Sequence, residues 1–208
     1  QVLTMLQEMA TRKTNAVLQV LADAKQVETE RRYPESGLLF ADKHWRAFYH
    51  CHEATSMHPD EHGHFHIFTD LGDGNWAHVA GLSIDTHGQP LQWFMVNRWV
   101  TDGAWLQQER FFQQLALVLA SDESDGLVAN WLVSLLQLYR ATLFELLEKR
   151  DAVIASHLKA RSRLQVFDDG NIYTLATWPI NLQATLEKNL LQNHINATQH
   201  VMGCEHVS

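Results

Sequence analysis

The chain has 208 residues, of which 46% are hydrophobic, so it is long enough to bury a core of ordinary size. Its formal net charge of −8 and its scattered lysines and arginines leave no basic face for nucleic acid. Because no apolar run approaches the ~20 residues that a membrane span needs, and no signal-peptide pattern opens the chain, we expect a soluble, cytoplasmic protein without a membrane partner.

Residues 1–33 are predicted to form N-terminal helices. Apolar residues recur at helical spacing from about Val2 to Glu30, and the run from Arg31 to Pro34 ends the pattern. The spacing fits either one helix or two.

Residues 46–100 have the character of an antiparallel sheet. Short aromatic and β-branched runs alternate with segments rich in turn residues. A four-stranded meander is the simplest arrangement, with strands over Ala47–Glu53, His64–Thr69, Trp76–Ile84 and Leu91–Val100.

Residues 104–192 return to helical spacing, and residues 193–208 are predicted to be a tail. The expected elements are a helix over Trp105–Ala120, one long helix over Leu127–Leu158, a short hairpin across Asp168–Asn171 and a last helix over Leu182–Gln192. The predicted fold is therefore a single α+β domain spanning residues 1–208, with a sheet of about four strands packed against helices from both ends of the chain. Several strands are apolar at both parities, so we expect both faces of the sheet to be covered.

The main chemical signal is histidine, because nine of the 13 histidines lie between His44 and His87. His50 and His52 are two apart, as are His64 and His66, and this spacing puts each pair on one face of a strand. If the first two strands form a hairpin, His50 lies opposite His66 and His52 opposite His64, with Cβ atoms about 5 Å apart. A tight turn after the second strand would then set His66 opposite His78.

This patch of His50, His52, His64, His66 and His78 predicts a transition-metal site, since neutral imidazole is the commonest ligand of such ions. General abundance favours iron or zinc, and copper or nickel also fit. The two cysteines, Cys51 and Cys204, cannot form a paired-cysteine zinc site. In the alternative reading, backbone or water satisfies each histidine singly.

Acidic residues border the same patch. Glu61 is the preferred candidate for a catalytic acid or base, and it is equally able to orient a ligating imidazole. Glu53 has the opposite strand parity to His52, so it would reach the site only if the strand ends or bulges there. The same parity argument places Cys51 on the other face.

Three classes of function fit these residues. The leading one is a metalloenzyme with oxygen-dependent or hydrolytic chemistry on a small-molecule substrate. A non-enzymatic metal or haem carrier would use the same histidines with a closed coordination shell. A structural or interaction module would bind no metal, and the apolar stripe of the long helix could then form a homo-oligomer.

Three runs of the chain resemble an uncharacterised bacterial domain family of unknown function: Tyr49 to Glu53, Glu61 to His66, and Val96 to Val100. The specific part is the run Glu-His-Gly-His-Phe-His from Glu61 to His66. The resemblance covers most of the chain beyond the first helix, and it implies no activity.

Overall fold

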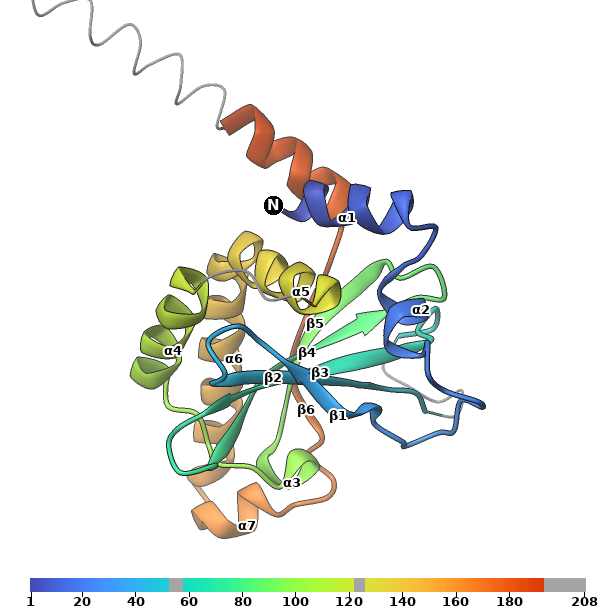
Figure 1. The fold of residues 1–208 in the computed structure, drawn as a ribbon. Coiled ribbons are helices and arrows are strands. Elements are labelled where there is room, and N and C mark those ends of the chain that lie inside the picture. The colour runs from blue at the N-terminus through green and yellow to red at the C-terminus, as the bar shows by residue number, and fades with distance from the viewer. Residues whose placement is uncertain (53–57, 122–125, 193–208) are drawn as a thin grey trace, which may run out of the picture.

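The computed structural model describes residues 1–52, 58–121 and 126–192. The fold is α+β, as predicted, and its centre is a six-stranded antiparallel meander in which each strand pairs with the next one along the chain (Figure 1). The strands are β1 (Tyr33–Leu39), β2 (Trp45–His50), β3 (Gly63–Asp70), β4 (Trp76–Ile84), β5 (Pro90–Val96) and β6 (Thr174–Pro179). The helices are α1 (Val2–Thr11), α2 (Ala16–Val20), α3 (Arg98–Thr101), α4 (Gln108–Ala120), α5 (Leu127–Leu138), α6 (Arg140–Leu158) and α7 (Arg163–Phe167), followed by a helical segment over residues 182–192.

The prediction of four strands was wrong because both edge strands have unusual signals. β1 contains Pro34 and Gly37, which are typical of turns, and much of the strand is exposed at the sheet edge. β6 pairs with β5 although more than 70 residues separate them in the chain. The predicted hairpin across residues 168–171 is also wrong, since the segment before the turn is α7.

The predicted long helix is in fact two helices, α5 and α6, bent by 75° at Tyr139. The ring of Tyr139 packs against Trp93 of β5, and its hydroxyl donates a hydrogen bond to Thr185. These contacts come from parts of the chain distant in sequence, so helical spacing alone could not reveal the bend. Among the described helices, none is alone long and apolar enough to span a membrane, and α5 and α6 meet that test only when joined across their bend.

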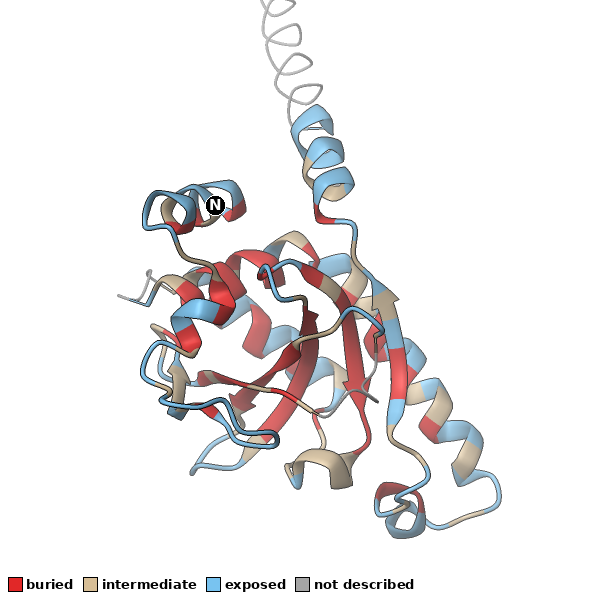
Figure 2. Cartoon of the chain, turned by 90° about the vertical axis from the view of Figure 1, so that its right-hand side faces the viewer, coloured by how far each residue is buried: buried red, intermediate tan, exposed pale blue. Residues whose placement is uncertain are grey.

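The sheet is buried on both faces, as predicted, and Figure 2 shows its central strands as the most buried part of the chain. Helices α5 and α6 contact the sheet, α1, α2 and α4 pack against α5, and together with one face of the sheet they form the main hydrophobic core. Strand side chains on this face include Tyr49, Phe65, Ile67, Leu82 and Trp93. Cys51 also belongs to this core, in agreement with its predicted face.

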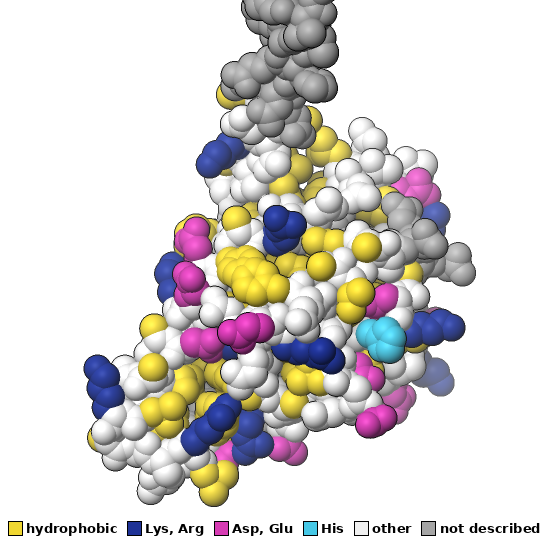
Figure 3. All heavy atoms as spheres, turned by 90° about the vertical axis from the view of Figure 1, so that its left-hand side faces the viewer, with side chains coloured by type: hydrophobic (Ala, Val, Ile, Leu, Met, Phe, Trp, Pro, Cys, Tyr) yellow, Lys and Arg dark blue, Asp and Glu magenta, His cyan; other side chains and the backbone are white. Residues whose placement is uncertain are grey.

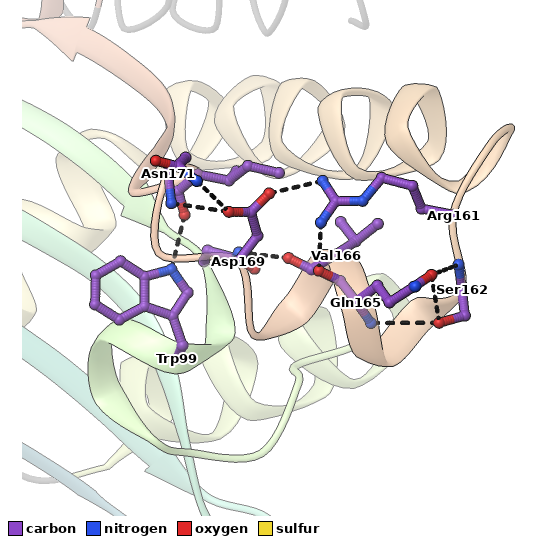
Figure 4. Close-up of polar contacts among 9 residues, drawn as sticks. Trp99, Arg161, Ser162, Gln165, Val166, Asp169 and Asn171 are labelled. Carbon is purple, nitrogen blue, oxygen red and sulfur yellow. Dashed lines mark hydrogen bonds and ion pairs between the residues drawn. The ribbon is translucent and has the colours of Figure 1, made fainter.

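The connection from α7 to β6 is held by local hydrogen bonds (Figure 4). Ser162 and Gln165 form a capping box at the start of α7, and Arg161 pairs with Asp169 in the following turn. Trp99 of α3 donates its indole N–H to the carbonyl of Ile172 in the same connection. These bonds join α3 to the segment that leads into β6.

Figure 3 shows the side of the molecule that carries α4 and α6. Hydrophobic side chains gather near the middle of this side, with acidic and basic side chains interspersed around them. Phe112 and Leu117 of α4 are exposed. Homo-oligomerisation stays a prediction.

Candidate metal site

The histidine cluster lies on the sheet face opposite the main core. β2 contributes Phe48 and His50 to this face, and β3 contributes His64 and His66. His50 pairs with His64 and Phe48 pairs with His66. The predicted pairing of His50 with His66 was therefore wrong by two residues. The error arose because β2 ends at His50, so the connection to Gly63 is longer than a hairpin turn between the predicted strands. A slip of two residues leaves every side chain on its predicted face.

Gly63 allows β3 to begin close to β2. A Cβ atom at this position would lie 2.5 Å from both the carbonyl oxygen of His50 and the hydroxyl of Tyr49. Any residue larger than glycine would push the two strands apart directly beside His64.

A β-bulge in β4 brings His78 to the same face. His66 pairs with Gly81 and Ile67 with Ala80, but the next residue of β3, Phe68, pairs with His78. The skipped residue, Val79, lies in the main core. The predicted pairing of His66 with His78 was wrong, yet the two rings are in contact, with centroids 5.0 Å apart.

Three imidazoles form the centre of the site. His50 Nε2 lies 2.7 Å from His64 Nε2, and the ring centroids of His64 and His66 are 4.8 Å apart. His64 and His66 are buried, whereas His50 is half-buried. One ligand atom from each of these three residues lies within 4.8 Å of the others, so they could hold a metal ion.

The side chain of Glu61 is fully buried beside His64. Its Oε1 lies 2.5 Å from His64 Nδ1, and its other carboxylate oxygen, Oε2, is buried without a hydrogen-bond partner. The contact to Nδ1 leaves Nε2 of His64 directed at His50. Of the two roles left open by the sequence, this geometry fits orientation of an imidazole.

His66 and His52 have partners of their own. His78 Nε2 lies 2.9 Å from His66 Nδ1, so His78 contacts the cluster through His66. His52, which follows the end of β2, pairs with Glu30, and its ring centroid lies 4.7 Å from that of His50. Glu30, His50 and His52 make a second group with the spacing of metal ligands.

Sequence reasoning missed Glu30, which lies 20 residues before His50. Its backbone N–H donates to the carbonyl of Cys51, and this contact places it beside the cluster. Nothing in the local pattern around Glu30 indicates this position. Glu53, the alternative carboxylate, lies outside the described residues.

Burial favours the neutral form of the central imidazoles. It lowers the pKa of His50 to about 3, with further contributions from His64 and His52. It also lowers the pKa of His66 well below its ordinary value and that of His78 to about 3. A neutral imidazole keeps the lone pair that a metal ion needs.

Aromatic rings enclose the cluster. Phe94 of β5 contacts the rings of His64 and His66, with centroid distances of 5.1 and 5.7 Å. Phe48 contacts His50 and His66 at 5.7 and 5.6 Å. These apolar walls limit the access of water to the buried imidazoles.

His78 and Asn97 line one small cavity of about 10 Å³. The Asn97 side chain is fully buried and is used structurally, because it donates to the carbonyl of Val166 and accepts from the N–H of Arg98.

Comparison with known proteins finds one family. Residues 1–180 match the model of a family described as Domain of unknown function (DUF6969). The match confirms the resemblance to a family of unknown function that the histidine motifs indicated. No curated protein and no solved structure is detectably similar to the chain.

Proposed function

Since the chain belongs to the DUF6969 family of unknown function, we propose its role from the histidine geometry: it is a transition-metal-binding protein with a metalloenzyme site. The observation that supports the proposal is the convergence of His50, His64 and His66, whose ligand atoms lie within 4.8 Å of one another. Three protein ligands leave a coordination position open, as catalytic sites do for water or substrate.

The hydrogen bonds around the three imidazoles support the same set of ligand atoms. Glu61 occupies Nδ1 of His64, and His78 occupies Nδ1 of His66, so the Nε2 atoms of both rings remain for an ion. Histidine ligands commonly have their second nitrogen held by such a partner. Glu61 and His78 are thus positioning residues in this proposal.

The proposed substrate is a small molecule, and the reaction is hydrolytic or oxygen-dependent. A site of three imidazoles suits zinc, iron, copper or nickel, and iron or zinc is the expected ion. The buried, aromatic surroundings of the cluster would strengthen electrostatic effects at a bound ion.

A metal carrier is the second candidate, because Glu30 and His52 lie beside His50. If His52 joined the other three histidines, the shell would have four ligands and no open position. Glu30 would then orient His52, just as Glu61 orients His64.

Metal content measured by plasma mass spectrometry tests the proposal. We expect near-stoichiometric transition metal in the tag-free protein and loss of that metal in the double variant His64→Ala/His66→Ala. His87→Ala is the matched control, since the side chain of His87 is 83% exposed and belongs to neither group of candidate metal ligands. A parent protein that binds no added zinc, iron, copper or nickel would refute the proposal.

The cobalt(II)-substituted protein separates the enzyme from the carrier. Azide should change the visible absorption spectrum if a coordination position is open. A spectrum insensitive to azide, together with loss of metal in His52→Ala, would favour the carrier.

A further inference from the structure

A second pocket lies on the border of the histidine cluster. It has a volume of about 420 Å³, which is the size of a small-molecule site. Its walls come from β2, from the end of β3 and the loop to β4, and from residues 101–104 at the end of α3 and just beyond it. We call it the arginine pocket, after Arg32 and Arg46 in its lining.

Aromatic rings hold both guanidinium groups in the arginine pocket. The Cζ atom of Arg32 lies 4.5 Å from the ring centroid of Phe48, and that of Arg46 lies 4.0 Å from the ring of Trp76. Arg46 is also 5.8 Å from the ring of Phe68. Stacked in this way, the guanidinium planes are oriented before any ligand binds.

The positive charge of this pair is poorly compensated. Within the described part of the chain, neither Arg32 nor Arg46 forms an ion pair with a carboxylate. Arg46 Nε is buried and has no hydrogen-bond partner. Burial lowers the pKa of Arg46, and the nearby charge of Arg32 lowers it further, while Asp70 acts in the opposite direction. Asp102 also lines the pocket, as an exposed residue.

The apolar floor of the arginine pocket is shared with the histidine cluster. Phe48 pairs with His66 across β2 and β3, and Phe68 pairs with His78 across β3 and β4. The ring of Phe48 therefore contacts Arg32 on one side and the rings of His50 and His66 on another. A molecule held by the arginines needs to extend only past this ring to reach the half-buried His50.

We propose that the arginine pocket binds the oxyanion group of a small molecule with an apolar body, and that this molecule is the substrate of the histidine site. A carboxylate or a phosphate would satisfy the donors of both arginines, including the unpartnered Nε of Arg46. Phe48, Phe68 and Trp76 would contact the apolar body. The link to a substrate rests on the proposed function, whereas binding of the oxyanion does not.

The binding step is tested on metal-free protein with benzoate and phenyl phosphate as probes and benzamide as the uncharged control. The side-chain Nε–H signals of arginine, followed by NMR, should show saturable shifts for Arg32 and Arg46. We expect binding to weaken about tenfold or more in Arg32→Gln and in Arg46→Gln, since each loses a charged hydrogen bond. Arg110→Gln, an exposed position on α4, is the matched control and should bind as the parent does.

Near-ultraviolet circular dichroism shows whether Arg46→Gln, whose side chain packs on Trp76, retains the fold. Arg32 is exposed, so Arg32→Gln keeps the test decisive even if the other variant does not fold. The stronger of the two anionic probes identifies the preferred oxyanion. Equal binding of benzamide and benzoate, or parent-like binding by Arg32→Gln, would overturn the proposal.

The link to the histidine site is tested in cobalt(II)-loaded protein. Protons of bound benzoate should broaden strongly, because Phe48 contacts the rings of His50 and His66, which would hold the ion. This broadening should vanish in Arg32→Gln although its metal content is unchanged. Retained metal with no binding of either anion would overturn the arginine pocket and leave the metal site intact. Anion binding by a protein that takes up no added cobalt(II) would overturn the metal site and leave the arginine pocket intact.

Discussion

Replacing Gly81 by alanine should destabilise the protein through a clash with Phe94. A Cβ atom at Gly81 would lie 2.0 Å from Phe94 Cζ and 2.2 Å from Cε2, far inside van der Waals contact. Phe94 is fully buried and packs against the rings of His64 and His66, so it cannot move into solvent.

Two effects of opposite sign determine the magnitude. Alanine in a strand is normally better than glycine by about 0.5–1 kcal/mol because it restricts the unfolded chain. Overpacking of a close-packed interior costs about 1–3 kcal/mol, and this overlap belongs at the upper end of that range. We therefore expect a net loss of about 2 kcal/mol, which lowers Tm by about 4–8 °C in a chain of this size.

The assay is thermal and urea unfolding of Gly81→Ala, Phe94→Leu and the double variant. If the clash is the cause, Phe94→Leu should make room for the new methyl group, so the double variant should be more stable than additivity predicts. Gly170→Ala is the control, since a Cβ at Gly170 would have no neighbour within 4 Å. Parent-like stability of Gly81→Ala, or strict additivity in the double variant, would refute the reasoning.

Three further predictions concern protons, the buried carboxylate and a helix cap. The folded-state pKa values of His50 and His78, about 3, lie below the unfolded value near 6.5, so their contribution to stability is complete above pH 6.5 and is lost as the pH falls towards 3. Urea unfolding of metal-free protein should show each histidine removing up to about 1.4 kcal/mol per pH unit in that window, and a constant stability from pH 7 to pH 5 would contradict this. Glu61→Gln removes the charge beside His64 and should weaken metal affinity about 10- to 100-fold in a competition titration, unlike Asp60→Asn at its exposed neighbour. Ser162→Ala breaks the capping box of α7 and should cost about 1 kcal/mol in thermal unfolding with metal content unchanged; an unaltered Tm would show that the cap contributes little.

The sequence could predict which face of the sheet carries the cluster, because a register error of an even number of residues leaves each side chain on the same face of its strand. The pairing of β2 with β3 differs from the prediction by two residues, and an even slip keeps His50, His64 and His66 on one face. The register between β2 and β3 was not predictable, since it depends on where β2 ends. The connection of residues 51–62 carries no tight-turn signal.

The contacts from outside the predicted strands could not be derived from any local pattern. Glu30 reaches His52, and Arg32 reaches Phe48, because the segment before β1 runs beside the end of β2. β1 itself has the composition of a turn, so its pairing with β2 had no signal. Residues of this segment that contact the site can be identified only once the order of the six strands in the sheet is known.

His78 lies against His66, as predicted, although the predicted pairing of these two residues was wrong. The register next to His66 differs from the predicted one by three residues, and an odd slip would have turned His78 into the main core. The bulge at Val79 inserts one more residue and returns His78 to the face of His66. The contact between these two imidazoles therefore depends on an irregularity of the strand. Since bulges in strands often re-aim a side chain beside a functional site, the irregularity itself supports the proposal that His78 positions the nitrogen of His66 that would bind a metal ion.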